Sequence, residues 1–384
     1  MTEKSYCLDT ARPVRDKSLN GARIKLHENK LDGFLITNRA NVLYLSGFSG
    51  SDGVLLLTDK KNYLITDFRY VEQAAKESPN VSIVEHKTTL MNAAASKAGR
   101  LKLRRLGIES KSINLDQFNE LREKAGGIKI IPAKDFVEEL REVKDVDEVK
   151  EITNAIKIAE EAFGKVVKLM RAGMARHGGM PWSEKDLADM LDFRMRKYGA
   201  QKNSFDTIVA AGSKSSLPHA KPGQEEAIHS GKPVLSEANV ILFDWGAQVG
   251  FYNSDLTRVV FTDRMLGQAK KVFQIVLDAQ RFAIERIKSG VAVREVDRVA
   301  RSYIEKRGFG KQFGHGLGHG IGLEVHESPA INRRNKKPLK AGMVITIEPG
   351  IYLPGWGGIR IEDMVLVTED GCRVLSHFPK QIVL

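Results

Sequence analysis

Short apolar runs, separated by turn-forming residues, fill the first third of the chain. GFLIT, NVLYL, GVLLL, NYLIT, VSIVE and IKIIP lie between residues 33 and 132 and are bounded by Gly, Asn, Asp or Pro. Runs of this length that are rich in Val, Ile, Leu and Tyr are typical of β-strands. The segments FRYVEQAAKE and LDQFNELREKA lie between them and have helical patterns. We therefore predict an α/β domain in this part of the chain.

A charged segment, EELREVKDVDEVKE at residues 138–151, contains few large apolar side chains. We place a domain boundary there, which gives domains of residues 1–145 and 146–384. Apolar residues then recur at spacings of three and four, which predicts an amphipathic helix: Ile152, Ile156, Ala159, Phe163, Val166, Val167 and Met170. A second helix is predicted to start at Ser183, with Asp186 as its capping-box partner. Two more are expected over residues 268–287 and up to Gly308.

Apolar strands are interleaved with these helices in the second domain. They are FDTIVAAG, NVILFDWGAQVGFYNSDLTRVVF, MVITIEPGIY and GIRIEDMVLVT, and some of them contain glycines where the chain can fold back as a hairpin. Helices together with antiparallel strands predict an α+β fold for this domain.

The composition is that of a globular protein with two domains. Of its 384 residues, 42% are hydrophobic and 28% charged, which excludes a fibrous or mainly disordered chain. Two cysteines, Cys7 and Cys372, build neither a disulfide framework nor a cysteine zinc site, and so favour the reducing cytoplasm. The apolar runs are far shorter than the ~18 residues of a membrane span. We therefore expect a cytoplasmic protein with no membrane partner.

The formal net charge of +12 raises the question of an acidic partner. Excess positive charge can attract nucleic acid or acidic membranes. Here the basic residues are spread along the chain, and clusters such as KLRRL at 102–106 and RRNKK at 333–337 are interrupted or short. The charge indicates a solvated basic surface, and we do not expect nucleic acid as a partner.

Four acidic residues lie on or beside apolar strands of the second domain. Asp244 and Asp255 are eleven residues apart, with Gly246 and Gly250 between them. A turn near Gly250 would fold the two strands back so that both carboxylates face one point. Glu348 and Glu362 stand on either side of a turn rich in Pro and Gly. Buried carboxylates are costly unless they are paired or bind a metal.

Histidines in the same domain lie in an unusual setting. His315, His319 and His326 occur in FGHGLGHGIGLEVHESP, among five glycines, and His219 lies in the loop SSLPHAKPG. Glycine allows close approach of backbone and otherwise lowers stability, so its density here indicates a site. A lone histidine is more often solvated, and only the combined set of carboxylates and glycine-framed histidines carries weight.

The charges of this set indicate a two-metal hydrolytic site. Four clustered carboxylates would repel one another, whereas two divalent cations and a bridging hydroxide would bring the cluster near neutrality. Such metals lie roughly 3.5–4 Å apart. Oxygen ligands with a single imidazole favour Mn²⁺, with Co²⁺, Fe²⁺ or Zn²⁺ as alternatives. The motifs GxxxxGK[ST], GxSxG and HExxH are absent from the sequence.

At these residues the chain resembles the metallopeptidases that include aminopeptidase P, prolidase and methionine aminopeptidase. FDWGAQVGFYNSDLTR, HGLGHGIGLEVHESP and EPGIYLPGWGGIRIED match the family's signature blocks in order. GFSGSDGVLLLTDKKNYLITDFRY resembles the N-terminal domain of the Xaa-Pro peptidase branch. The resemblance implies a creatinase/prolidase-like α/β domain at 1–145, a pita-bread catalytic domain at 146–384, and homodimerisation.

The resemblance also implies the metal ligands. Asp244 would bind one metal, His319 and Glu348 the other, and Asp255 and Glu362 both. The ligand histidine of the family lies seven residues before the histidine of the VHE tripeptide, which selects His319.

Four further residues acquire roles from the same family pattern. His219 and His326 would hydrogen-bond the substrate and the tetrahedral intermediate, and Glu348 would carry a proton to the leaving nitrogen. His315 and Arg360 would bind the proline side of the substrate.

Several functions fit this pattern. The leading hypothesis is an aminopeptidase P-like enzyme that cleaves peptides with proline at the second position, and the alternative is an Xaa-Pro dipeptidase. Methionine aminopeptidase fits less well because it lacks the N-terminal domain. A metal-free amidinohydrolase or binding protein of the same fold is disfavoured by the complete ligand set. The turn YLPGWGG, with Trp356 as its one bulky side chain, favours an open rim and hence the aminopeptidase.

Overall fold

The computed structural model describes residues 16–223, 239–262, 265 and 267–384. Two compact units meet within the charged segment, since one ends at Arg141 and the next begins at Glu142. This boundary lies shortly before the predicted one at residue 145. Cys7 lies outside the described residues, and Cys372 is a half-buried free thiol. In the described part of the chain, no helix has the length and apolar character needed to cross a membrane.

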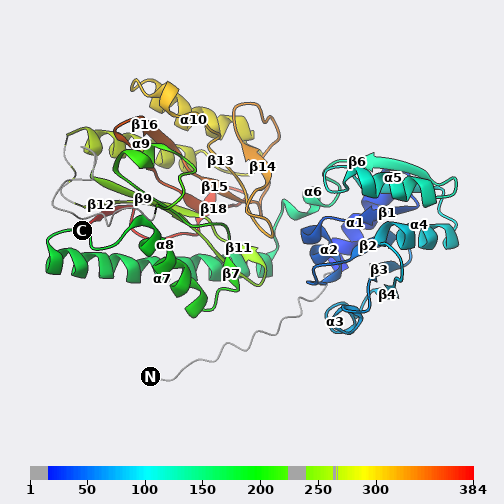
Figure 1. The fold of residues 1–384 in the computed structure, drawn as a ribbon. Coiled ribbons are helices and arrows are strands. Elements are labelled where there is room, and N and C mark those ends of the chain that lie inside the picture. The colour runs from blue at the N-terminus through cyan, green and yellow to red at the C-terminus, as the bar shows by residue number, and fades with distance from the viewer. Residues whose placement is uncertain (1–15, 224–238, 263–264, 266) are drawn as a thin grey trace. The chain divides into compact units, whose positions relative to one another are not determined.

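A mixed six-stranded sheet forms the N-terminal unit, in the order β4-β3-β2-β1-β5-β6 (Figure 1). The strands are β1 (Gly33–Ile36), β2 (Val54–Thr58), β3 (Asn62–Thr66), β4 (Ser82–Glu85), β5 (Arg105–Glu109) and β6 (Lys129–Ala133). The helices are α1 (Asp16–Glu28), α2 (Arg39–Ser46), α3 (Val71–Glu77), α4 (Leu90–Arg100), α5 (Leu115–Lys124) and α6 (Glu138–Arg141). Alanines 94, 95 and 98 of α4 pack with Leu35, Leu56 and Ile65 of the sheet, which confirms the predicted α/β organisation.

The run NVLYL was predicted as a strand and is instead most of helix α2. The Asn38 side chain accepts a hydrogen bond from the Asn41 backbone N–H, which caps the helix, and Gly47 ends it with φ 80°. All five residues of NVLYL are buried, so their apolar character reports burial on every side and does not distinguish a strand from a short helix.

The second unit contains helices in the regions where the sequence predicted them. They are α7 (Val146–His177), α8 (Glu184–Lys197), α9 (Gly267–Glu285) and α10 (Val293–Glu305), with short 3-10 helices η1 (Gly212–Ser216) and η2 (Gly310–Gln312). The capping box between Ser183 and Asp186 is confirmed at α8. A second capping box, between Asp145 and Glu148, starts α7 inside the charged segment. The charges there therefore stabilise a helix start as well as marking the boundary.

Two larger sheets carry or adjoin most of the predicted site residues of this unit, and short ladders lie beside them in the chain (Figure 1). One has the order β20-β12-β9-β8, with β8 (Ile208–Ala211), β9 (Val240–Trp245), β12 (Leu256–Phe261) and β20 (Gln381–Val383). The other has the order β14-β13-β15-β18-β19, with β13 (Gly318–Gly320), β14 (Glu327–Ile331), β15 (Val344–Ile347), β18 (Asp363–Val367) and β19 (Cys372–Val374). Smaller ladders are β7 (Lys202–Asn203) with β10 (Ala247–Val249) and β11 (Tyr252–Asn253), and β16 (Gly350–Leu353) with β17 (Gly357–Arg360).

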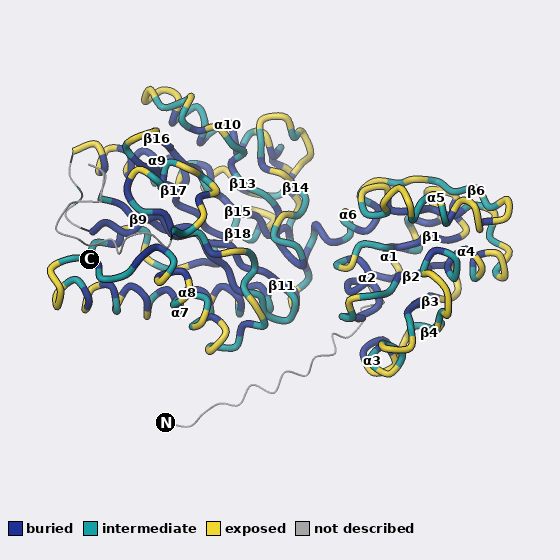
Figure 2. Tube along the Cα trace, viewed as in Figure 1, coloured by how far each residue is buried: buried dark blue, intermediate teal, exposed yellow. Residues whose placement is uncertain are grey.

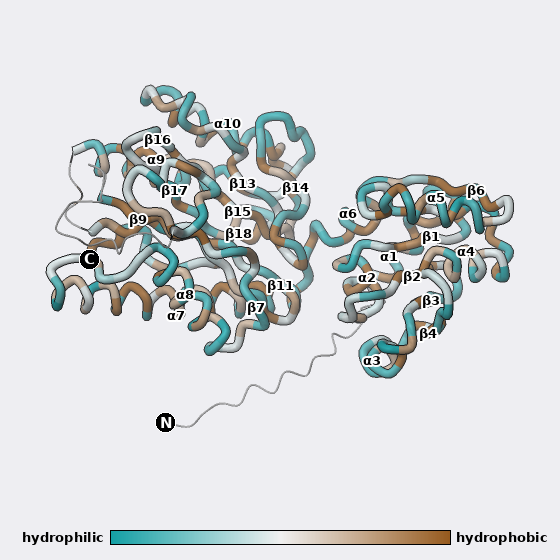
Figure 3. Tube along the Cα trace, viewed as in Figure 1, coloured by the Kyte–Doolittle hydropathy of each residue, from teal (hydrophilic) through white to brown (hydrophobic). Residues whose placement is uncertain are grey.

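The strands that lead to the predicted site residues are buried and apolar. Figure 2 shows β9, β15 and β18 as buried chain, and Figure 3 shows apolar residues along the same strands. Their core includes Val240, Leu242, Ile345, Ile347 and Val365. Strands packed on both faces are rigid, so they can hold carboxylates at fixed positions.

Candidate metal centre and active site

Asp244 and Asp255 lie on one face of an antiparallel strand pair. Asp244 of β9 stands opposite Thr257 of β12, and Asp255 is two residues before Thr257. Alternating side chains point to the same face, so all three share it. The expected fold-back is confirmed, since β10 and β11 pair around Gly250, which has φ 54°.

Glu348 and Glu362 lie at a break between two ladders. The β15–β18 ladder ends at the pair Ile347 and Asp363, and the β16–β17 hairpin starts at Gly350 and Arg360. Both glutamates therefore lie outside regular pairing. Thr257 links this break to the other sheet, because its Oγ1 donates to Glu362 Oε2 at 2.6 Å.

His319 of β13 faces the carboxylates with one ring nitrogen. Its Nδ1 is 3.0 Å from the Gly320 carbonyl oxygen, which makes Nδ1 the protonated nitrogen in the neutral ring. Its Nε2 lies 3.3 Å from Glu348 Oε1 and 3.6 Å from Asp255 Oδ2. Ligand atoms of Asp255, His319 and Glu362 all lie within 4.8 Å of one another. In the neutral ring the Nε2 lone pair would face carboxylate oxygens, an arrangement suited to a cation. Burial lowers the pKa of His319, but the hydrogen bond and charge of Glu348 outweigh this and raise it, so without a cation the protonated ring is favoured.

The glycines around His319 allow backbones to approach closely. A Cβ atom at Gly318 would lie 2.0 Å from the Thr346 carbonyl oxygen, and one at Gly320 would lie 2.2 Å from that of Ser328. Any larger residue would push β13 away from its two neighbouring strands. The glycine density seen in the sequence therefore serves to hold His319 against the carboxylates.

One cavity of about 560 Å³ brings all nine predicted residues together. They are Asp244, Asp255, His319, Glu348, Glu362, His219, His326, His315 and Arg360. Further lining residues that the sequence did not reveal as site residues include Lys311, Gln312 and Tyr352. Tyr352 is in the signature block around Glu348, which was the available signal. Lys311 and Gln312 are in no such block.

The carboxylates are buried, and nearby positive charge compensates their negative charges unevenly. Burial raises the pKa of Asp255 well above its ordinary value, and the neighbouring carboxylates, Glu362 foremost, raise it further. Burial and the charges of Glu348 and Asp244 likewise raise the pKa of Glu362 well above its usual range. Burial alone would raise the pKa of Glu348, but the hydrogen bond and charge of His319 lower it to about 2.

This donor set fits divalent cations. Asp244 Oδ1 and Glu362 Oε1 are buried and have no hydrogen-bond partner among the described residues. Buried polar atoms are usually paired, so two orphaned carboxylate oxygens that line one cavity indicate a missing positive partner. Oxygen donors with one imidazole suit hard or intermediate divalent metals.

Arg360 compensates part of the negative charge. Its side chain is buried, and each of its nitrogens donates to a protein oxygen. Nη2 lies 2.5 Å from Asp244 Oδ2, Nε lies 2.9 Å from Thr257 Oγ1, and Nη1 lies 2.9 Å from the Tyr352 hydroxyl. The Tyr352 hydroxyl is also 3.1 Å from His315 Nε2. Arg360 and His315 are thus joined through Tyr352 on one side of the cavity.

Comparison with known proteins gives matches over both units. The model of metallopeptidase family M24 matches residues 150–369, and that of the creatinase/prolidase N-terminal domain matches residues 19–143. An Xaa-Pro dipeptidase of Pyrococcus horikoshii is 33% identical over 360 residues, which are 93% of this chain and 96% of the relative. Both expected domain types are therefore confirmed.

Solved structures have the same architecture. An Xaa-Pro dipeptidase from Bacillus anthracis has a TM-score of 0.88 at 36% identity and covers 96% of this chain and 99% of its own. An X-Pro aminopeptidase from Thermotoga maritima has a TM-score of 0.82 at 39% identity, covering 94% of this chain and 100% of its own. The expected α/β plus pita-bread fold is thereby confirmed.

Proposed function

We propose that this chain, which belongs to metallopeptidase family M24, acts as an Xaa-Pro dipeptidase. The chain is a metallopeptidase of the Xaa-Pro type, and the open question is the length of its substrate. The sequence favoured an aminopeptidase P-like enzyme. The end-to-end relatives named Xaa-Pro dipeptidase support the alternative better. Aminopeptidase activity remains the second candidate, because the similar structure from Thermotoga maritima is that of an X-Pro aminopeptidase.

A positively charged side chain on the cavity wall supports dipeptidase activity. A dipeptidase has to recognise a free carboxylate close to the scissile bond, which an Arg or Lys does best. Arg360 is engaged by Asp244, Thr257 and Tyr352. Lys311 of η2 also lines the cavity, is exposed, and has no ion-pair partner among the described residues. We assign to Lys311 the recognition of the substrate carboxylate.

The proposed metal ligands are the five that the resemblance implied: Asp244, Asp255, His319, Glu348 and Glu362. Divalent cations, for which this oxygen-rich set favours Mn²⁺, would supply Lewis acidity and lower the pKa of water. Glu348 is the proposed proton carrier to the proline nitrogen that leaves. Its lowered pKa, about 2, means that it is ionised, and Thr346 Oγ1 and His319 hold its Oε1 in place.

His326 and His219 are proposed to act on the substrate. The His326 ring meets the His319 ring edge to face, with centroids 4.3 Å apart. Burial lowers the pKa of His326, and the charge of His319 lowers it further, so His326 is neutral at pH 7 and can donate one hydrogen bond.

Replacement of either histidine by alanine is expected to reduce kcat by roughly 10²–10³-fold, the usual loss when a donor to a developing oxyanion is removed. Both His326→Ala and His219→Ala should still bind metal like the parent, because neither residue is in the proposed ligand set. Metal content and steady-state rates of the two variants check this. Loss of metal in either would show that the assignment of ligands is wrong.

The proposed substrate is tested with Ala-Pro, its amide Ala-Pro-NH2, and Ala-Pro-Ala-Ala. We expect Ala-Pro to be cleaved faster than either of the other two. Lys311→Gln should lower kcat/KM for Ala-Pro by roughly fivefold, since an exposed ion pair contributes up to about 1 kcal/mol. It should leave the amide unaffected, because the amide has no carboxylate.

Lys306→Gln serves as the control, because Lys306 is exposed and does not line the cavity. Release of alanine from the tetrapeptide as fast as from Ala-Pro would establish the aminopeptidase instead. Equal effects of Lys311→Gln on Ala-Pro and its amide would refute the role of Lys311.

A further inference from the structure

The break that holds Glu348 and Glu362 leaves backbone groups without ladder partners. Regular pairing stops at Ile347 and Asp363 on one side and at Gly350 and Arg360 on the other. Ile347 is in the last pair of the β15–β18 ladder, whereas Ile361 lies in the gap. Their carbonyl groups directly precede the two glutamates and lie inside the protein, where such groups are hydrogen-bonded. Across the gap the Ile361 N–H donates a long hydrogen bond to the Pro349 carbonyl oxygen, at 3.4 Å. A further group that holds the two segments together would therefore add to a weak backbone link at the metal site.

Gln280 supplies both hydrogen bonds. It lies in α9 and is fully buried. Its Nε2 donates to the Ile347 carbonyl oxygen at 2.9 Å and to the Ile361 carbonyl oxygen at 3.0 Å. One amide group thus joins the segment that ends in Glu348 to the segment that ends in Glu362.

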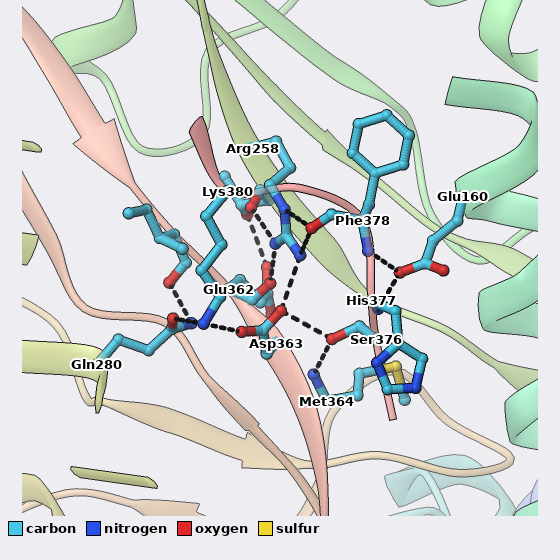
Figure 4. Close-up of polar contacts among 12 residues, drawn as sticks. Glu160, Arg258, Gln280, Glu362, Asp363, Met364, Ser376, His377, Phe378 and Lys380 are labelled. Carbon is cyan, nitrogen blue, oxygen red and sulfur yellow. Dashed lines mark hydrogen bonds and ion pairs between the residues drawn. The ribbon is translucent and has the colours of Figure 1, made fainter. Parts of the chain in front are cut away.

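Lys380 fixes the orientation of this amide. Its Nζ lies 2.7 Å from Gln280 Oε1 and 2.7 Å from Asp363 Oδ2, as Figure 4 shows. With Oε1 accepting from an ammonium group, the amide NH2 has to face the two carbonyls. A neutral side chain with two hydrogens on one nitrogen meets this need without adding charge beside the carboxylates.

Arg258 also holds the second segment. Its Nη1 donates to the Glu362 carbonyl oxygen at 2.5 Å, and its Nη2 to Asp363 Oδ1 at 2.8 Å (Figure 4). Glu362 is thus restrained at two carbonyl groups. Gln280 binds that of the preceding residue, Ile361, and Arg258 binds that of Glu362 itself. Gln280 links the segments of Glu348 and Glu362 with two shorter hydrogen bonds than the backbone bond between Ile361 and Pro349.

We propose that Gln280 is a positioning residue that sets the separation of the Glu348 and Glu362 carboxylates and thereby the affinity of the site for divalent metal. This inference rests on the metal ligands proposed above. Residues that orient metal ligands from behind typically contribute 10–100-fold in metal affinity.

The experiment is a Mn²⁺ titration of the chelated full-length protein by calorimetry. Gln280→Met keeps the length of the side chain and removes both donors, and we expect 10–100-fold weaker Mn²⁺ binding. Lys380→Met leaves Gln280 in place but unoriented, and should weaken binding less, in the same direction. Gln274→Met is the matched control, an exposed glutamine of the same helix, and should bind Mn²⁺ like the parent.

Circular dichroism at the titration temperature shows whether each variant is folded. If Gln280→Met does not fold, Lys380→Met decides by the same criterion. If folded Gln280→Met binds Mn²⁺ as tightly as the parent, the proposed role of Gln280 is wrong. The same holds for Lys380→Met where it has to replace Gln280→Met. A parent that binds no metal instead overturns the proposed function, and the inference with it.

Discussion

Asp255→Asn is expected to lower peptidase activity by roughly 10³-fold and to weaken metal binding strongly. Asp255 is buried, and its Oδ2 faces His319 Nε2 at 3.6 Å. The amide has the same shape but no charge, and it is a poor ligand for two cations at once. A loss of this size is typical when a group that acts at the reacting centre is removed.

The same change is expected to stabilise the chelated protein. Burial and the nearby carboxylates raise the pKa of Asp255, so in the absence of metal its charged form disfavours the fold. This destabilisation grows as the pH rises from the unfolded pKa, near 3.8, through the raised folded pKa. Asp255→Asn removes it, so the gain in Tm should be present at pH 8 and absent at low pH.

Rates with added Mn²⁺ and thermal unfolding with chelator check both parts. Asp206→Asn, at an exposed aspartate of the same unit, is the control and should behave like the parent. If the Asp255→Asn enzyme is active, Asp255 is not a ligand of the metal. A lower Tm of the chelated variant would mean that Asp255 stabilises the fold without metal.

Arg258→Met is expected to cost about 3–5 kcal/mol in unfolding free energy, the usual effect of removing one partner from a buried ion pair. Arg258 and Asp363 are both fully buried and 2.8 Å apart, and Arg258 also donates to the carbonyl oxygens of Thr257, Glu362 and Phe378. Among the described residues, the change would leave Asp363 with only Lys380 as a cation, and it would leave several buried carbonyls without a donor from Arg258.

Urea unfolding followed by tryptophan fluorescence measures this effect. All three tryptophans, at positions 182, 245 and 356, are in the second unit, so the signal reports that unit alone. Arg281→Met is the control, because that arginine is on the surface of α9, and its cost should stay within about 0.5 kcal/mol. A loss below 1 kcal/mol for Arg258→Met would show that the pair contributes little.

The predicted site could be found in the sequence because its residues are unusual where they stand. Acidic residues in apolar strands and histidines framed by glycines have few structural explanations. Gly318 shows why the pattern is informative, since a Cβ there would collide with the Thr346 carbonyl oxygen. The capping box at Ser183 could be predicted for a similar reason, because its hydrogen bonds are local.

Other features have no local signal. Asn41 to Leu45 are apolar enough for a strand and form a helix, because full burial erases the periodicity that separates the two. Lys311 and Gln280 resemble any other lysine and glutamine of a helical segment. Their importance comes from what lies opposite them after folding, which is the cavity for Lys311 and two backbone carbonyl groups for Gln280.

By itself the sequence determined the two domains, the class of the fold, the family and the residues that gather at one cavity, because these depend on periodicity and on residue types that are costly elsewhere. The tertiary structure alone decided that the β15–β18 ladder stops at Ile347 and Asp363, that Gln280 bridges the resulting gap, and that the donors of Arg360 are taken by Asp244, Thr257 and Tyr352. Those contacts join residues far apart in the chain. Their hydrogen bonds exist only once distant strands and a helix pack together, so no local pattern records them.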